Sequence, residues 1–323
     1  MNGSPRQTAW FGTLSFLLLL GIFARALPVA TEAAQQVEPV RVIPVQGNVY
    51  MLQFSNTLGN IGVLPGPDGV LLIDDQVPGM TNNVLRGVRE ITDEEIRFVI
   101  NTHVHMDHFG GNPILADMGA TIISHKNVRD RMFQPHHTPR RGGTYAGAPI
   151  AEANRPILTF EDAMNFHMNG EDVRVWLVPR AHTDGDAFTY FATSDVLHTG
   201  DVFRTNMYPI IDVFNGGSLA GTIAATETAI ALAGPNTKVI PGHGDGFTDR
   251  DGLIEVLDMM VDIRDTIQEM IVSGMHLEEV LAARPTAEYD EQWGQVATWN
   301  AKDVVPIIYN ELGGGPTLPL GGN

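Results

Sequence analysis

The sequence contains no cysteine in its 323 residues. This absence excludes a disulfide framework, a thiolate ligand for a metal ion and a cysteine nucleophile. Any catalytic or metal-binding chemistry must therefore come from imidazole, carboxylate, hydroxyl or amino groups.

Basic residues are scarce. The chain has 20 Lys and Arg against 38 Asp and Glu, which gives a formal net charge of −18 at pH 7. A protein with this charge is repelled by the phosphate backbone of nucleic acids and by anionic membrane surfaces. We therefore expect no nucleic-acid partner.

The N-terminal region lacks an apolar run long enough for a membrane span. Its apolar run, residues 10–23, has 14 residues, whereas a spanning helix needs about 20. Arg6 precedes this run and small residues follow it around 30–34, which is the layout of a secretory signal peptide. We predict a signal peptide over residues 1–33, cleaved near Ala33, with a retained anchor as the alternative. The mature chain is then secreted or periplasmic and has no membrane span.

Short apolar stretches indicate how the remainder, residues 34–323, folds as a single domain. With 43% hydrophobic residues the chain can form a substantial core. In the first half, Gly, Pro and Asn clusters separate the stretches, which predicts antiparallel hairpins followed by a β-α-β passage. The expected strands are 40–45, 49–54, 61–64, 70–73, 96–101 and 121–124, and the expected helix is 79–93.

The second half has a similar order of elements. The expected strands are 173–178, 187–192, 196–199 and 238–240, with a helix over 219–233 and C-terminal helices over 251–273 and 276–284. Two halves of similar order predict an α+β fold in which two sheets pack together with helices outside. We expect the C-terminal helices to pack across one edge of this sandwich.

The strongest functional signal is the segment Asn-Thr-His-Val-His-Met-Asp-His at residues 101–108. In an extended backbone His103 and His105 project to the same side, so both can reach one ion. Asp107 and His108 follow where the strand turns over and can face a second ion. Imidazole nitrogens and carboxylate oxygens together suit zinc, and also iron or manganese.

Two metal ions need more ligands than this segment supplies. His182, Asp201 and His243 each follow an apolar strand and have a glycine close by. In isolation each is typical of a turn, but their order and flanking strands favour a ligand role.

The seven residues resemble the motifs of the metallo-β-lactamase superfamily over about residues 40–250: H-x-H-x-D-H, then a later His, a bridging Asp and a final His. The resemblance implies a four-layer αββα sandwich of two mainly antiparallel sheets. It also implies that His103, His105 and His182 hold one metal, that Asp107, His108 and His243 hold the other, and that Asp201 bridges them. The closer resemblance is to bridging-Asp members such as glyoxalase II and acyl-homoserine lactonases; some antibiotic-hydrolysing subclasses use a cysteine ligand.

This resemblance implies a dinuclear metallohydrolase that uses two divalent metal ions, with Zn²⁺ expected and Fe or Mn as alternatives. A hydroxide between the metals would attack an ester, thioester, lactone or β-lactam type bond in a small-molecule substrate, anionic or neutral. Asp107 would orient this hydroxide and carry its proton to the leaving group. The main alternative is a redox enzyme on the same fold, such as an iron-dependent persulfide dioxygenase. A nuclease and a non-catalytic metal-binding protein are further alternatives.

Other polar residues carry weaker signals. The basic segment 126–141 is either a lid that attracts anionic substrates or a solvated insertion. Tyr208, Asp212 and residues 215–218 either line the pocket or serve the core and turns. The remaining histidines lack ligand spacing; these are His125, His136, His137, His167, His198 and His276.

Overall fold

A β-meander opens the fold, as the turn residues predict. The computed structural model describes residues 39–55, 58–135, 137–140, 143–146, 148–178, 180–205 and 207–315, and the predicted signal peptide lies outside them. Gly47 makes the first turn with φ of 57°, where a Cβ would lie 2.2 Å from Ser194 Oγ. The four strands pair antiparallel in chain order: β1 (Arg41–Gln46), β2 (Val49–Gln53), β3 (Ile61–Leu64) and β4 (Val70–Ile73).

Three parallel strands complete this first sheet. They are β5 (Ile96–Asn101), β6 (Thr121–His125) and β9 (Leu158–Phe160), which follow β4 in the sheet. Helix α1 (Thr81–Ile91) connects β4 to β5, and α3 (Asn112–Asp117) lies between β5 and β6. Helical crossovers of this kind join parallel strands. The first sheet is therefore mixed, whereas we expected it to be mainly antiparallel.

The second sheet is mainly antiparallel, as expected. Its final strand is parallel to its neighbour because helix α5 (Leu219–Leu232) crosses between them. Its strands in order are β10 (Ala163–Met168), β11 (Glu171–Leu177), β12 (Ala187–Phe191), β13 (Val196–His198) and β14 (Lys238–Ile240). We did not predict β10, an edge strand whose residues are mostly exposed or only partly buried.

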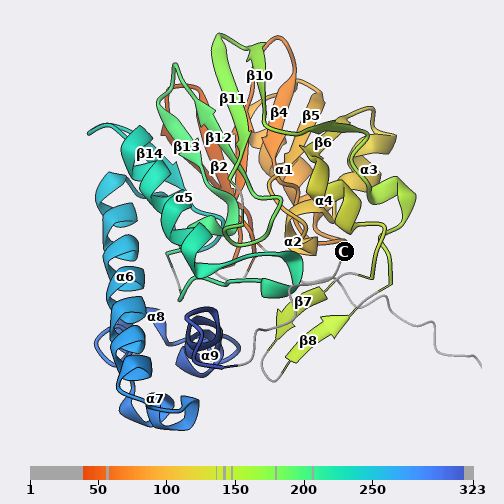
Figure 1. Cartoon of the computed structure of the whole chain (residues 1–323). Coiled ribbons are helices and arrows are strands. Elements are labelled where there is room, and N and C mark those ends of the chain that lie inside the picture. Colours follow the sequence, from red (N-terminus) through yellow and green to blue (C-terminus); the bar gives the residue numbers. More distant parts are fainter. Residues whose placement is uncertain are drawn as a thin grey trace, which may run out of the picture. The chain divides into compact units, whose positions relative to one another are not determined.

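Three apolar interfaces stack these elements into four layers. Ile100 and Phe191 belong to the core between the two sheets, and Val88 of α1 packs on the outer face of the first sheet. Leu197 of the second sheet packs with Ile263 on its helical side. Figure 1 shows the sheets between helices α1, α3 and α4 on one side and α5 and α6 on the other. The predicted αββα sandwich is confirmed.

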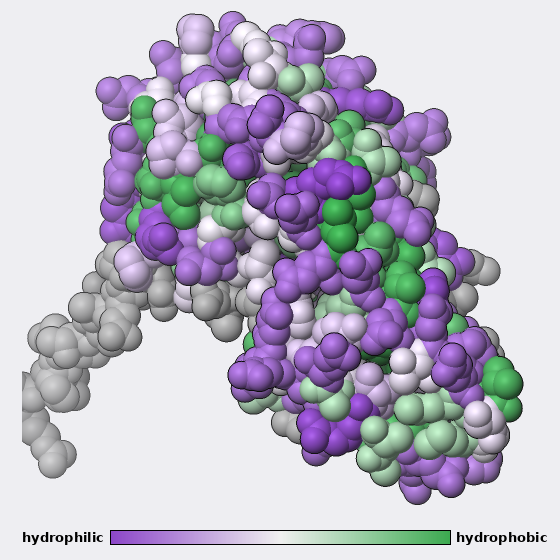
Figure 2. All heavy atoms as spheres, turned by 90° about the vertical axis from the view of Figure 1, so that its left-hand side faces the viewer, coloured by the Kyte–Doolittle hydropathy of each residue, from purple (hydrophilic) through white to green (hydrophobic). Residues whose placement is uncertain are grey.

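The C-terminal segment is helical and packs onto the second sheet. Of its four helices, the first two were predicted and the last two, α8 and α9, were not. Helix α9 contains Pro306, and proline disfavours helix interiors. The four are α6 (Arg250–Val272), α7 (Leu277–Ala283), α8 (Asp290–Trp293) and α9 (Ala301–Glu311). On the face that carries α5 and α6, a strip of apolar residues runs through a mostly hydrophilic surface (Figure 2). None of the described helices combines the length and apolarity needed to cross a membrane.

The basic segment has structure of its own. It begins with helix α4 (Lys126–Arg131) and continues into a hairpin of β7 (His137–Arg140) and β8 (Gly143–Ala146). Val128 and Met132 are buried against Phe109, which directly follows the histidine cluster. Helix α4 is therefore packed against the loop that carries the site.

Candidate metal centre

The histidine cluster lies immediately beyond the end of β5. His105 has an extended backbone, with φ of −86° and ψ of 143°. The short helix α2 (Met106–Phe109) begins there and carries Asp107 and His108. A helical turn, where we expected only a turn of the strand, thus directs these two side chains toward the same centre.

The other three predicted ligands also lie beyond strand ends. His182 is in the loop between β11 and β12, Asp201 lies in the 3-10 helix η2 (Gly200–Val202) after β13, and His243 follows β14. Gly242 lies against the Asp201 side chain, and a Cβ at this position would be 2.1 Å from Asp201 Oδ1. Only glycine fits at position 242, which explains the glycine before the last histidine.

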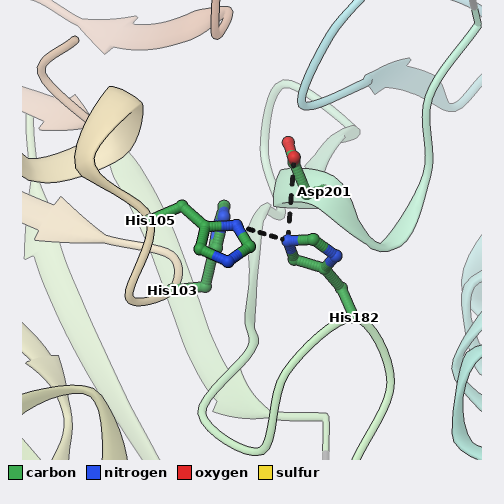
Figure 3. Close-up of side chains that lie close together, drawn as sticks. All are labelled: His103, His105, His182 and Asp201. Carbon is green, nitrogen blue, oxygen red and sulfur yellow. Dashed lines mark hydrogen bonds and ion pairs between the residues drawn. The ribbon is translucent and has the colours of Figure 1, made fainter. Parts of the chain in front are cut away.

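The structure brings all seven residues together in two groups. Their role as metal ligands stays a prediction. The first group is His103, His105, His182 and Asp201, and the second is Asp107, His108 and His243; within each, one potential ligand atom per residue lies within 4.8 Å of the others. Figure 3 shows the first group, with the three rings and the Asp201 carboxylate converging.

Asp201 lies between the groups. Its Oδ1 is 3.3 Å from Nε2 of both His108 and His243, and its Oδ2 is 3.8 Å from His182 Nε2. One carboxylate oxygen thus faces each group, which is the arrangement of a bridging ligand.

Hydrogen bonds fix the orientation of the imidazole rings. His105 Nε2 contacts Asp212 Oδ2 at 2.7 Å, and His108 Nδ1 contacts Asp74 Oδ2 at 2.7 Å. His182 Nδ1 contacts the Ile210 carbonyl oxygen at 2.6 Å. In the neutral form of each ring, the nitrogen that contacts one of these accepting oxygens carries the proton, and the other nitrogen can then bind a metal ion.

The donor set fits metal ions. His103 Nε2 is buried and has no hydrogen-bond partner in the part of the chain that the structure describes. His182 Nε2 lies 2.9 Å from His105 Nδ1, and His108 Nε2 lies 3.2 Å from His243 Nε2. Each of these two pairs can share a proton as a hydrogen bond, whereas the buried His103 nitrogen has no such partner, which is costly unless a cation binds there.

The two carboxylates are ionised at neutral pH. Burial opposes their ionisation, but His108 and His243 hold the pKa of Asp107 below its ordinary value. His243, Arg204 and His108 together hold the pKa of Asp201 well below its ordinary value. Both groups are therefore charged acceptors, the form in which a carboxylate binds a metal.

Three of the five rings are neutral at neutral pH. Burial lowers the pKa of His103 well below its ordinary value and that of His182 to about 4, and burial with the charge of Arg204 lowers that of His243. Although burial opposes it, the pKa of His105 is raised by Asp212 and that of His108 by Asp107 and Asp201. Neutral imidazole is the form that binds metal.

Among the seven described residues, Asp107 of the second group is the most exposed. The Asp107 side chain is 28% exposed, whereas His103 and His182 are completely or almost completely buried. Met106, between two predicted ligands, is 38% exposed.

Three further buried residues contact the seven. Asp74 and Arg204 were not predicted from the sequence, and the role of Asp212 was undecided. Asp74 holds His108 and also accepts hydrogen bonds from the backbone and side chain of Thr102. Asp212, considered as a pocket or turn residue, holds His105 and caps the 3-10 helix η3 (Val213–Asn215). Arg204 contacts Asp201. Asp74 follows an apolar strand, the same signal that identified the ligands, whereas Arg204 has no such signal.

The remaining described histidines lie outside the two groups. His125 contacts the Glu161 carbonyl oxygen and caps α4, His167 pairs with Asp172 at the surface, and His276 caps α7. His198 accepts a hydrogen bond from the Gly200 backbone. His136 and the side chain of His137 lie outside the described residues.

Several charges of the basic segment are already paired. Lys126 contacts Asp130, Arg129 donates to the Pro156 carbonyl oxygen, and Arg131 forms a two-pronged ion pair with Asp184 at 2.6 Å. The Arg140 side chain and Arg141 lie outside the described residues.

Comparisons with known proteins agree with this geometry. The metallo-beta-lactamase superfamily profile matches residues 44–244. A linear primary-alkylsulfatase from Pseudomonas sp. (strain ATCC 19151) is 21% identical over 247 residues, which cover 66% of this chain and 47% of that protein. This chain therefore spans about half the length of that relative.

Solved structures share the fold. The metallo-beta-lactamase from Pontibacter korlensis (15% identity, TM-score 0.57) and the DIM-1 metallo-beta-lactamase (16%, 0.54) match over 69% and 70% of this chain and 99% of their own. A double mutant of the sec-alkyl sulfatase PisA1 (16%, 0.63) matches over 85% of this chain and 50% of its own. With its fold, its converging histidines and carboxylates and the match of its residues 44–244, this chain belongs to the metallo-beta-lactamase superfamily.

Proposed function

We propose that this protein is a dinuclear metallohydrolase that cleaves an ester, thioester, lactone or β-lactam type bond in a small molecule. The observation that carries the proposal is the pair of ligand groups on either side of Asp201, whose two oxygens face one group each. His103, His105 and His182 would hold one ion, and Asp107, His108 and His243 the other. We propose Zn²⁺, with iron or manganese as alternatives.

Two divalent ions in such a site supply activation of water at neutral pH and polarisation of the bond to be cleaved. Asp107 is ionised, is 28% exposed and lies 3.1 Å from His243 through its Oδ2. From this position its carboxylate can orient the attacking water, accept its proton and pass that proton to the leaving group. Asp212 and Asp74 hold the rings of His105 and His108 in place.

A sulfate ester is a second candidate for the bond. The Pseudomonas relative is an alkylsulfatase by name. The match to the sec-alkyl sulfatase covers 85% of this chain, more than the fraction that precedes α6, so it includes part of the C-terminal helices. The two β-lactamase matches cover smaller fractions. An alkyl sulfate therefore belongs among the first substrates to test.

A one-iron persulfide dioxygenase is the main alternative. Such an enzyme needs only the first group of ligands. Here Asp107, His108 and His243 also converge, with His108 and His243 nearly completely buried. The presence of this second set favours the hydrolase.

We also propose export through residues 1–33, which N-terminal sequencing of the natural protein tests.

Elemental analysis of the purified full chain, together with a hydrolysis panel, tests the function. The panel contains a carboxylic ester, a thioester, a lactone, a chromogenic cephalosporin, a phosphodiester and an alkyl sulfate. We expect about two zinc ions per chain and turnover that a chelator abolishes. A single iron with oxygen consumption on a persulfide would replace the hydrolase with the dioxygenase.

A further inference from the structure

A cavity lies among the C-terminal helices, and the proposed chemistry does not use it. Its volume is about 640 Å³, and its walls come from the end of α7, from α8 and from the first turns of α9. None of its lining residues belongs to either ligand group. Figure 1 shows these three helices gathered beside α6. Sites for small molecules have volumes of about 300–1,000 Å³, so the cavity has the size of such a site.

Hydrogen bonds hold the wall of this cavity in place. The Asp290 carboxylate accepts hydrogen bonds from the hydroxyl groups of Tyr208 and Thr286, both at 3.0 Å. Its other oxygen pairs with Arg284 at 2.8 Å. Tyr208 is buried, and its backbone N donates to the Trp293 carbonyl oxygen at 3.0 Å. The cavity is therefore already formed before a ligand binds.

The cavity combines an apolar interior with a positively charged mouth. Most of its lining is apolar and includes Leu281 of α7 and Val305 of α9. Its charged lining residues are Arg284, Asp290 and Lys302, and the two basic side chains are exposed. The Asp290 carboxylate is already paired with Arg284. Lys302 has no ion pair among the described residues, so one positive charge is left over at the mouth.

Both basic residues stand out in this chain. Lys302 is one of only three lysines in a chain whose net charge is −18. Arg284 ends α7 with φ of 53°, a left-handed conformation in which glycine is the favoured residue. An acidic protein attracts cations over most of its surface. A positive mouth on this chain therefore selects against the ions that the remaining surface attracts.

We propose that this cavity is a binding site for a small amphipathic anion, namely a medium-chain alkyl carboxylate. The alkyl chain would lie against Leu281 and Val305, and the carboxylate would pair with Lys302 at the mouth. Removal of the alkyl chain from water drives such binding, and the charge at the mouth selects the sign of the ligand. This site is distinct from the proposed hydrolytic centre, and the inference does not depend on bound metal.

Titration calorimetry of the purified full chain with octanoate, and with octylammonium as the cation of the same chain length, tests this site. Lys302→Gln removes the charge at the mouth, and Ala301→Trp fills the cavity. Arg284→Gly removes the second positive charge with the residue that a φ of 53° favours, so this variant should fold even if Ala301→Trp does not. The control is Lys238→Gln, which removes the same charge at the start of β14, outside the cavity. Circular dichroism verifies the fold of each variant.

We expect octanoate to bind at a single site in each chain and more tightly than octylammonium. Lys302→Gln and Arg284→Gly should each weaken octanoate binding about fivefold, the effect of one charge a few ångströms away in water. Ala301→Trp should abolish the binding, and Lys238→Gln should leave it within about twofold. The inference is overturned if the parent chain binds no octanoate, or binds octylammonium as tightly. It is also overturned if the variants at the cavity leave octanoate binding unchanged, since the anion then binds elsewhere.

Discussion

The two ligand groups have different surroundings. In the first group the histidines are at most 7% exposed, and Asp212 and a backbone carbonyl hold two of the rings. The second group includes a partly exposed carboxylate, Asp107, and Asp74 holds the ring of His108. From this comparison we propose a division of roles, in which the first group would retain its ion and the second would meet the substrate.

Replacement of Asp107 tests the catalytic side of this comparison and has the largest expected effect. In Asp107→Ala we expect kcat to fall by about 10²–10⁴-fold, the contribution of a positioned acid or base. The melting temperature of the metal-free protein should change little, because the side chain is partly exposed. Steady-state kinetics and thermal unfolding measure the two effects. Full activity in this variant would contradict the proposed role of Asp107.

Replacement of Asp201 tests whether the groups share a ligand. Asp201→Ala removes the one carboxylate whose oxygens face both groups, so both ions should bind more weakly. Elemental analysis after dialysis against trace zinc measures the loss. An unchanged content of two ions would contradict the bridging assignment.

Asp212 and Asp74 hold ligand rings by hydrogen bonds without belonging to either group, and we call them anchors. Their replacement should weaken metal binding by each group separately. Asp212→Asn affects His105 in the first group, and Asp74→Asn affects His108 in the second. Loss of such an anchor typically costs about 10–100-fold in metal affinity. Calorimetry of the metal-free chain with Zn²⁺ should show that Asp212→Asn and Asp74→Asn each weaken a different binding event. If both variants weaken the same event, the groups do not bind independently.

The sequence predicted which side chains converge better than it predicted their hydrogen-bond partners. The seven predicted ligands come after apolar strands, and strand ends of a sandwich converge, so His182 and His243 could be placed near the cluster without coordinates. Asp212 is 107 residues from His105 in the chain, and the contact depends on how the loops pack. The burial of Arg204 follows from its pairing with the loop of His243, which no local pattern reveals.

A buried carboxyl group in the loop of His182 provides a pH test of the first group. Burial raises the pKa of Asp186 to about 8, although Thr183 donates two hydrogen bonds to it. The folded state therefore holds a proton that the unfolded chain releases near pH 4, so stability falls as pH rises from about 4 to 8. In the metal-free protein, Asp186→Asn should raise the melting temperature by about 2–4 °C at pH 8 and much less at pH 5. An equal shift at both pH values would show that the group is ionised in the folded protein.

The smallest expected effect concerns the basic segment beside the second group. The ammonium of Lys126 is exposed and contacts Asp130 one helical turn away. Since salt screens exposed charges, Lys126→Ala should change KM for an anionic substrate by less than about twofold at physiological ionic strength. Steady-state kinetics with an anionic and a neutral substrate of the same reaction class measures this. A much larger rise in KM for the anionic substrate alone would favour a lid that attracts anions, and would make helix α4 part of the entrance to the centre.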